Sequence, residues 1–352
     1  MSGNSKLAIV QDLRGIAALA VVISHAMSLV QSYSVKYGIA DSRLNQFYHL
    51  NAVGTAGVDI FFVTSGFIMV YITRNKSAGL DAAGDFLVHR YKRIYPLYWL
   101  VTLALAAVYV IMPSSLHRDV QVDTRFLQSS FLLFGSENSM GDFSPLVPVA
   151  WTLAYEIFFY NLFALGLIGF LNRGRSWFVA LAFAGFMGLR SLGFNQGFAG
   201  NSLVLEFVYG IAIANLYSQR KSLPQWLTRI SLVGAVVGFG ALTYFGYIDV
   251  VPLRGFQAGL PAAALVIAFL FNPAQKSLPW LNKLGDASYS LYLTHFLVQV
   301  AIGRVWVKIP FLLAAPPELL ILVLIAASVI VALMCYRWIE SPLIARQSRT
   351  KV

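Results

Sequence analysis

Cysteine and charge are both scarce in this 352-residue chain. The single cysteine, Cys335, excludes an internal disulfide and a metal cluster built from cysteines. Charged residues make up only 12% of the sequence, which is about half of the share that soluble proteins carry. Because a soluble chain of this length could not bury the 58% of residues that are hydrophobic, the composition indicates an integral membrane protein.

Several motifs of soluble enzymes are also absent. The chain has no phosphate-binding loop of the pattern G-x-x-x-x-G-K-[ST], no H-E-x-x-H zinc helix and no G-x-S-x-G nucleophile elbow. The five histidines lack the close spacing of metal ligands. We therefore expect no metal cofactor.

What the sequence does have is a series of long apolar runs. Each is close to the roughly 20 residues that a helix needs to cross a bilayer, so they predict an all-α bundle of about ten transmembrane helices. The expected spans are 7–30, 52–73, 94–112, 149–171, 176–193, 201–218, 229–247, 256–271, 287–307 and 316–339. A shorter apolar stretch near 124–134 predicts an interfacial or re-entrant helix.

The net charge of +11 is explained by the orientation of these helices. With the N-terminus inside, most Lys and Arg residues fall on cytoplasmic segments, as the positive-inside rule requires. We therefore expect both termini in the cytoplasm and no binding of nucleic acid. We expect one membrane domain over residues 1–345 and a short basic cytoplasmic tail over 346–352. The first span also resembles a signal peptide, but its removal would break the even helix count, so we expect it to be retained.

Two ionisable side chains lie in the first predicted helix. Arg14 and His25 are eleven residues apart, about three helical turns, which puts them on nearly the same face about 16 Å apart. Ionisable groups at membrane depth are costly and usually functional. A histidine also suits proton transfer, because its ordinary pKa is near neutrality. His25 is thus a candidate general base, with Ser24 as a candidate cavity-lining neighbour; the structural alternative is an imidazole that bonds between helices.

Two carboxylates from other predicted helices have a similar depth. Asp59 follows Gly57-Val58 in the second span, and Glu156 follows Tyr155 in the fourth span, where Tyr155 is a candidate cavity-lining residue. Either carboxylate could orient the imidazole of a general base. The alternative role for each is a salt bridge between helices.

A basic cluster stands before the third predicted span. Arg90 and Arg93 are three residues apart and share a face if the helix begins that early. Two guanidinium groups there would form a clamp for phosphates, whereas the structural alternative is a topology signal that contacts anionic lipids. His295, in the ninth span, either lines the same cavity or bonds between helices, and Glu206 in the sixth span is a weaker candidate of the same kind.

Taken in order, these segments resemble the integral membrane acyltransferase family 3, which includes bacterial exopolysaccharide and O-antigen O-acetyltransferases. The resemblance covers essentially the whole chain, although no single motif is specific. The motifs that carry it are Leu13-Arg14-Gly15 with His25, Gly57-Val58-Asp59 with Ser65-Gly66-Phe67, Arg90-x-x-Arg93 with Tyr95-Pro96, Trp151-Thr152-Leu153 with Glu156, Ser288-Tyr289-Ser290 with His295, and Arg337-Trp338-Ile339-Glu340.

The resemblance implies the activity and the roles of the residues. Such proteins take an acyl group from acyl-coenzyme A in the cytoplasm and deliver it to a sugar hydroxyl outside. His25 would be the catalytic histidine, with Glu156 or Asp59 orienting its ring, and Arg14, Arg90 and Arg93 would bind the donor. Acetyl-CoA is the expected donor, and a surface polysaccharide or lipid-linked oligosaccharide is the expected acceptor, in a bacterial cytoplasmic membrane.

Two other classes of protein remain open at this point. A transporter or flippase of a lipid-linked sugar would also place charges at mid-depth, although no duplicated halves are visible. A non-catalytic subunit of a polysaccharide synthase is the second alternative. Because the chain ends soon after the last predicted span, we expect the membrane domain itself, or a partner protein, to engage the acceptor.

Overall fold

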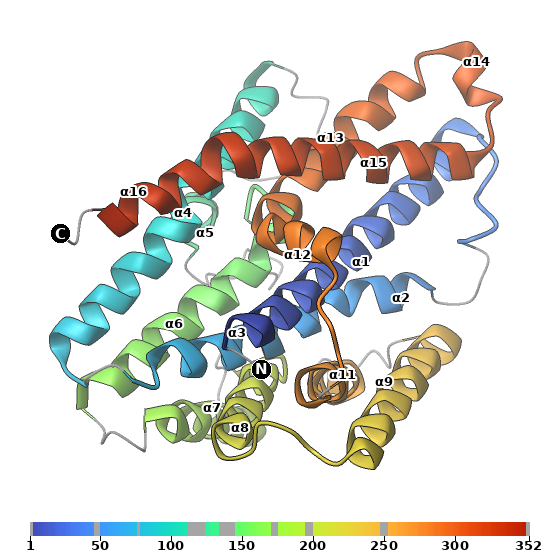
Figure 1. The fold of residues 1–352 in the computed structure, drawn as a ribbon. Coiled ribbons are helices and arrows are strands. Elements are labelled where there is room, and N and C mark those ends of the chain that lie inside the picture. The colour runs from blue at the N-terminus through green and yellow to red at the C-terminus, as the bar shows by residue number, and fades with distance from the viewer. Residues whose placement is uncertain are drawn as a thin grey trace. The chain divides into compact units, whose positions relative to one another are not determined.

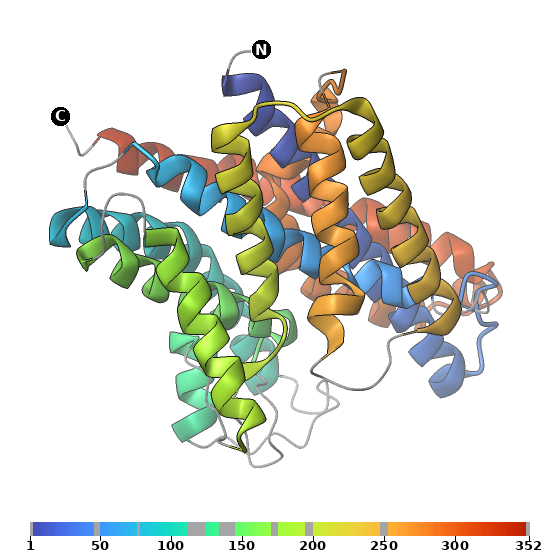
Figure 2. The same ribbon diagram turned by 90° about the horizontal axis from the view of Figure 1, so that it is seen from below.

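The computed structural model describes residues 3–45, 50–75, 78–111, 124–133, 145–169, 175–193, 200–246, 253–272 and 274–349. All regular secondary structure in these residues is helical (Figures 1 and 2). The predicted all-α class is therefore confirmed.

Six segments of the described residues are long and apolar enough to cross a membrane. They are Leu7–Tyr37, Leu50–Thr73, Pro148–Ile168, Gln225–Phe245, Arg254–Phe271 and Pro317–Ala345. Each coincides with one of the ten predicted spans. The other four predicted spans fall on helices that are shorter or more polar, so the count of about ten stays a prediction.

The chain folds as two compact units, the first made of Met1–Ile72 with Leu205–Tyr336 and the second of Thr73–Val204 with Arg337–Val352. The helices of the first unit are α1 (Gly3–Tyr37), α2 (Leu50–Thr55), α3 (Gly57–Thr73), α8 (Val204–Gln219), α9 (Gln225–Phe245), α10 (Arg254–Gln257), α11 (Gly259–Phe271), α12 (Pro279–Asp286), α13 (Ser288–Trp306), α14 (Pro310–Leu313) and α15 (Pro317–Cys335). Those of the second unit are α4 (Leu80–Ile111), α5 (Thr124–Leu132), the 3₁₀ turn η2 (Pro148–Ala150), α6 (Trp151–Gly169), α7 (Arg175–Ser191) and α16 (Ser341–Arg349). A π-helical turn, η5 (Tyr336–Glu340), joins α15 to α16. The division into one domain over 1–345 and a tail over 346–352 stays a prediction, and residues 350–352 lie outside the described part.

Helix α1 is the centre of the first unit. It packs against α2, α11, α12, α13 and α15. Its 35 residues contain no proline, and its buried apolar side chains contribute to three separate core clusters. The helix ends at Tyr37, where Gly38 adopts a φ of 67° that favours glycine at a helix C-terminus.

Small residues let the helices of this unit approach closely. A Cβ atom added to Gly15 would lie 2.7 Å from the carbonyl oxygen of Leu281 on α12. A Cβ atom added to Gly285 on α12 would lie 2.0 Å from the carbonyl oxygen of Gln11 on α1. At the crossing of α3 and α8, a Cβ added to Gly210 would lie 2.1 Å from the Val63 carbonyl oxygen. These separations exclude any larger residue without movement of the backbone, a common basis of helix packing in membranes.

In the second unit, α4 and α6 lie side by side and antiparallel (Figure 1). The backbone N–H of Gly79, just before α4, donates to the carbonyl of Leu167 near the end of α6 (2.9 Å). Tyr91 donates to Asn161 across the pair (2.7 Å). Because α4 begins at Leu80, about fourteen residues before the predicted span, Arg90 and Arg93 both lie well inside a helix.

The short apolar stretch predicted near 124–134 forms α5, whose nine residues are too few to span a membrane. Its last carbonyl groups accept hydrogen bonds from aromatic side chains of α4. Tyr98 donates to Ser130 (2.6 Å), and Trp99 donates to Phe131 (2.8 Å). These bonds satisfy carbonyls that a helix end leaves without an intrahelical partner.

Candidate active site

Two histidines from α1 and α13 lie against each other in the first unit. The rings of His25 and His295 have their centroids 4.9 Å apart, and Nε2 of His295 is 3.3 Å from Nδ1 of His25. His295 has no exposed surface, whereas His25 is half-buried. The structure thus pairs the predicted catalytic histidine with a residue that the sequence left undecided.

The local backbone determines which nitrogen of His25 carries the proton. Nδ1 of His25 lies 2.9 Å from the carbonyl oxygen of Val21, one helical turn earlier. Because a carbonyl oxygen only accepts, Nδ1 must be the donor, and in the neutral ring Nε2 is then left with a free lone pair. No described residue hydrogen-bonds to Nε2, so the ring presents an unprotonated nitrogen that can take a proton from a substrate.

Neighbouring contacts fix α13 and α2 against α1 at this level. The buried Gln299 amide donates to the carbonyl of Val22 on α1 (2.9 Å). Ser24, a candidate cavity-lining residue, is buried, and its hydroxyl donates to the carbonyl of Asn51 (3.2 Å). Ser24 therefore holds α1 against the start of α2 in this structure.

Arg14 lies further along α1 toward its N-terminal end. Its guanidinium donates to the hydroxyl of Ser288 through Nε (3.3 Å) and Nη2 (3.2 Å), and it lies over the ring of Phe61 at 5.8 Å. Close to it, the buried Asp12 carboxylate accepts from the backbone of Leu278 (3.0 Å), which anchors α12 to α1. These contacts hold the Arg14 side chain at the junction of α1, α3 and α13.

Asp59, predicted as a partner of the catalytic histidine, pairs with an arginine instead. Its fully buried carboxylate lies 3.2 Å from Nη2 of Arg254 on α10. Glu206 on α8 is also fully buried and interacts with Asp59 and Arg254. Within the first unit, no described carboxylate bonds to His25, so the role of Asp59 in orienting its ring stays a proposal.

A second polar cluster lies in the second unit between α4 and α6. Tyr160 donates a short hydrogen bond to Glu156, one helical turn earlier, and the Arg90 side chain interacts with the Tyr160 hydroxyl. Arg90 also lies over the ring of Phe86, at 5.9 Å from its centroid. Burial is the main influence on the Arg90 guanidinium and lowers its pKa, while Tyr160 and Glu156 oppose that shift.

This cluster joins residues that the sequence assigned to different depths. Arg90 was expected before the third predicted span and Glu156 within the fourth, at a depth similar to that of His25, but Tyr160 connects them. Arg93, one helical turn after Arg90, is half-buried and near enough to influence it electrostatically. Tyr155 is buried, with its ring 5.9 Å from that of Trp151.

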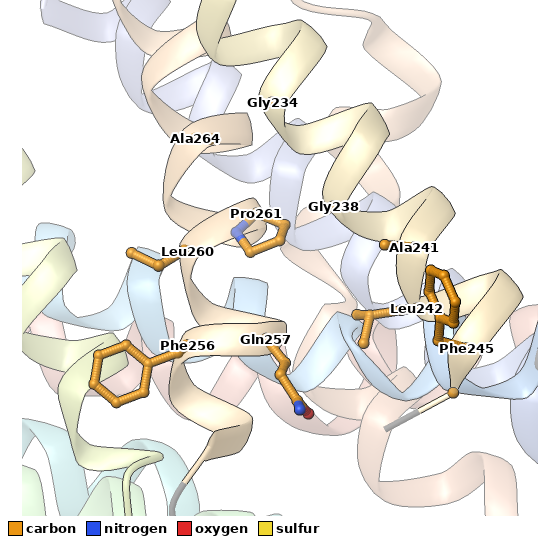
Figure 3. A pocket seen from close by; sticks show the side chains of 11 residues that line it. Gly234, Gly238, Ala241, Leu242, Phe245, Phe256, Gln257, Leu260, Pro261 and Ala264 are labelled. Carbon is orange, nitrogen blue, oxygen red and sulfur yellow. The ribbon is translucent and has the colours of Figure 1, made fainter. Parts of the chain in front are cut away.

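A groove of about 500 Å³ opens between α9 and the α10–α11 segment (Figure 3). Apolar and glycine residues line it, together with the Gln257 amide. None of the described residues that line it is titratable. The groove therefore lacks a group for acid–base chemistry, and the candidate active site is the histidine pair.

Comparison with known proteins identifies the family to which the chain belongs. The acyltransferase domain of acyltransferase family 3 matches residues 12–337, and the chain therefore belongs to that family. Membership makes the chain an acyltransferase and favours an enzyme over a transporter, a flippase or a non-catalytic subunit. In the described residues, no group of three or more His, Cys, Asp or Glu side chains is arranged to hold a metal ion.

Curated relatives cover most of the chain. The exopolysaccharide production protein ExoZ of Rhizobium meliloti (strain 1021) is 29% identical over 320 residues, which are 86% of this chain and 94% of ExoZ. Acyltransferase MdmB of Streptomyces mycarofaciens is 26% identical over 321 residues, 81% of this chain and 77% of MdmB. O-acetyltransferase OatA of Staphylococcus aureus (strain NCTC 8325 / PS 47) is 24% identical over 84% of this chain, which spans about half (54%) of OatA. No solved structure matches the chain.

Proposed function

We propose that this chain is a membrane O-acyltransferase that moves an acyl group, expected to be acetyl, from cytoplasmic acyl-CoA to a hydroxyl of a surface polysaccharide or lipid-linked oligosaccharide. The names of the relatives ExoZ and OatA, which refer to exopolysaccharide production and O-acetyl transfer, support the acceptor and the acyl group. Six membrane-length apolar segments support a multi-pass protein. The proposed location is a bacterial cytoplasmic membrane, with both termini inside.

The observation that carries this proposal is the free Nε2 of His25. A lone pair on a half-buried imidazole can remove the proton of an acceptor hydroxyl while its oxygen attacks the thioester carbonyl. The new C–O bond forms as the C–S bond breaks, and the proton held on Nε2 passes to the leaving thiolate. Acyl transfer through a transient acyl-imidazole on the same nitrogen is the covalent form of this mechanism.

The donor is proposed to bind through arginines. Coenzyme A carries several phosphate groups, and guanidinium groups bind phosphates with paired hydrogen bonds. Arg14, Arg90 and Arg93 are the proposed ligands. Arg90 is half-buried, and its buried Nε has no hydrogen-bond partner among the described residues, so this nitrogen remains able to donate. A hydrogen bond to a charged group contributes about 1.5–3 kcal/mol, which corresponds to about 10- to 100-fold in donor affinity.

The test is acceptor-dependent thiol release by the purified protein in nanodiscs supplied with acetyl-CoA. His25→Ala should abolish release, because it removes the nitrogen that takes the proton of the acceptor hydroxyl. His89→Ala is the matched control, since Nδ1 of His89 also contacts the carbonyl one turn earlier (Asp85, 2.6 Å) but His89 is not part of the histidine pair. Near-normal transfer by a well-expressed His25→Ala variant would show that the catalytic assignment is wrong.

Donor binding is tested separately with Arg90→Ala and Arg93→Ala. Each should raise the KM for acetyl-CoA, whereas Arg229→Ala on the exposed start of α9 should leave it unchanged. If donor affinity is unchanged in both variants, these arginines do not bind the donor and serve topology or structure instead.

A further inference from the structure

The two histidines of the pair are held in the same way by their own helices. Nδ1 of His295 lies 3.0 Å from the carbonyl oxygen of Leu291, just as Nδ1 of His25 lies 2.9 Å from that of Val21. In addition, Nε2 of His295 lies 3.3 Å from Nδ1 of His25. The three contacts together determine where the protons are.

Each carbonyl requires a proton on the Nδ1 atom that faces it, because a carbonyl oxygen cannot donate. If His295 also carried a proton on Nε2, it would be a cation with no exposed surface. That proton would moreover point at the protonated Nδ1 of His25. The consistent arrangement is therefore two neutral rings, both protonated on Nδ1, in which the His25 Nδ1–H is shared between Val21 and Nε2 of His295.

We propose that His295 is a positioning residue that orients His25 and keeps its proton on Nδ1, so that Nε2 of His25 is the catalytic base. This inference rests on the proposed function of His25. Because His295 is fully buried, it acts through His25 and does not contact the acceptor or the donor itself. The backbone bond to Leu291 in turn fixes the proton of His295, so that its Nε2 remains an acceptor.

The same contact operates when His25 becomes charged. After Nε2 of His25 has taken the hydroxyl proton, the ring is an imidazolium, and its Nδ1–H is a stronger donor to Nε2 of His295. His295 stays neutral throughout, and the proton on Nε2 leaves with the thiolate. A carboxylate is the more familiar partner for a catalytic histidine. A neutral imidazole serves the same purpose here, and it avoids a buried carboxylate that would have no charged partner while His25 is neutral.

The kinetic test compares two substitutions of His295. His295→Gln places an amide oxygen, which can accept from Nδ1 of His25, near the position of Nε2, whereas His295→Leu removes the acceptor. We expect His295→Leu to lower kcat about 10- to 100-fold, the equivalent of one charged hydrogen bond, with the KM for acetyl-CoA unchanged. His295→Gln should recover most of this loss.

The matched control is Thr294→Val, a nearly isosteric change at the neighbouring buried position. Among the described residues, its hydroxyl bonds only to the carbonyl of Ser290 within α13 (2.8 Å), so kcat should be unchanged. If His295→Leu has wild-type kcat, or if Gln and Leu at position 295 are equally impaired while both proteins are folded, His295 is not a positioning residue.

The tautomer is tested without any assay of activity. Nitrogen-15 NMR of the wild-type protein, labelled at its histidine rings, should show His25 and His295 protonated on Nδ1. The signals of the two rings are assigned by comparison with the spectra of the His25→Ala and His295→Gln variants. Detection of His25 with its proton on Nε2 would overturn the inference. If the Nδ1 tautomers are found but His25→Ala still transfers acyl groups, the proposed function fails while the geometry holds. If His25 is essential and His295→Leu is fully active, only the role of His295 fails.

Discussion

Replacing Arg254 by methionine removes the guanidinium that faces two fully buried carboxylates, Asp59 and Glu206, and keeps most of the apolar bulk of the side chain. Two unit charges 3.2 Å apart interact by about 5 kcal/mol at an effective dielectric constant of about 20. The Arg254 side chain is 26% exposed, so solvent screens part of this interaction. We therefore expect a loss of about 3 kcal/mol, at the lower end of what breaking a buried ion pair costs.

This loss should be visible as a fall in the unfolding temperature. For domains of 150–250 residues, 1 kcal/mol corresponds to about 2–4 °C, so the expected fall for 3 kcal/mol is roughly 6–12 °C. The measurement is the fraction of protein that stays monodisperse in size-exclusion chromatography after heating. Arg229→Met, at an exposed position of α9, is the control for the loss of a positive charge.

A double variant separates the ion pair from a general effect of substitution. Asp59→Asn alone should also destabilise, but Asp59→Asn combined with Arg254→Met should lose less than the sum of the two, because the double variant leaves one fewer charge buried without a partner. Strict additivity, or an Arg254→Met protein that unfolds at the wild-type temperature, would refute the reasoning. Thiol release by a folded Asp59→Asn variant then decides whether Asp59 has a role beyond this pair.

Three further predictions concern packing, the second unit and topology. Gly210→Val should destabilise the protein by about 1–3 kcal/mol in the same heating assay, since a Cβ there would meet the Val63 carbonyl at 2.1 Å. The control, Gly240→Val, has open space around its Cβ and should not destabilise. Equal stability of the two variants would contradict the close crossing of α3 and α8. Tyr160→Phe removes the hydroxyl between Arg90 and Glu156 and should cost about 2 kcal/mol; an unchanged unfolding temperature would mean that the hydroxyl adds no net stability. Topology can be tested in a Cys335→Ser background, which has no other cysteine. A cysteine placed at exposed Ser32 should react with an impermeant thiol reagent from outside, and one placed at exposed Ser222 should react only after the membrane is opened. The reverse pattern would show that the helices cross the membrane in the opposite direction.

The helical class could be predicted from the sequence because long apolar runs with few charges have few other stable forms in a membrane. The start of α4 could not. Hydropathy registers only the apolar part from about residue 94, whereas the helix begins at Leu80 and includes a polar stretch whose stability comes from packing against α6. This difference moved Arg90 from a helix end to the interior of a helix.

The candidate site was only partly predictable for a related reason. His25 and His295 were each recognisable as buried ionisable groups, but 270 residues separate them and a single sequence carries no sign of their contact. The sequence instead suggested a carboxylate partner, and the structure places Asp59 with Arg254, whose charge had counted only toward topology. The Glu156–Tyr160 bond is the exception, since a spacing of four residues on a helix predicts that two side chains meet.

The close helix crossings described for the first unit have a consequence for genetics. A selection for inactive alleles should recover substitutions at Gly15, Gly210 and Gly285 as readily as substitutions at His25, because each glycine permits a backbone approach that no larger residue allows. The two groups of alleles would look alike in a plate assay and differ in the amount of protein in the membrane. Measuring protein abundance for each allele would therefore sort those that prevent assembly from those that stop the chemistry.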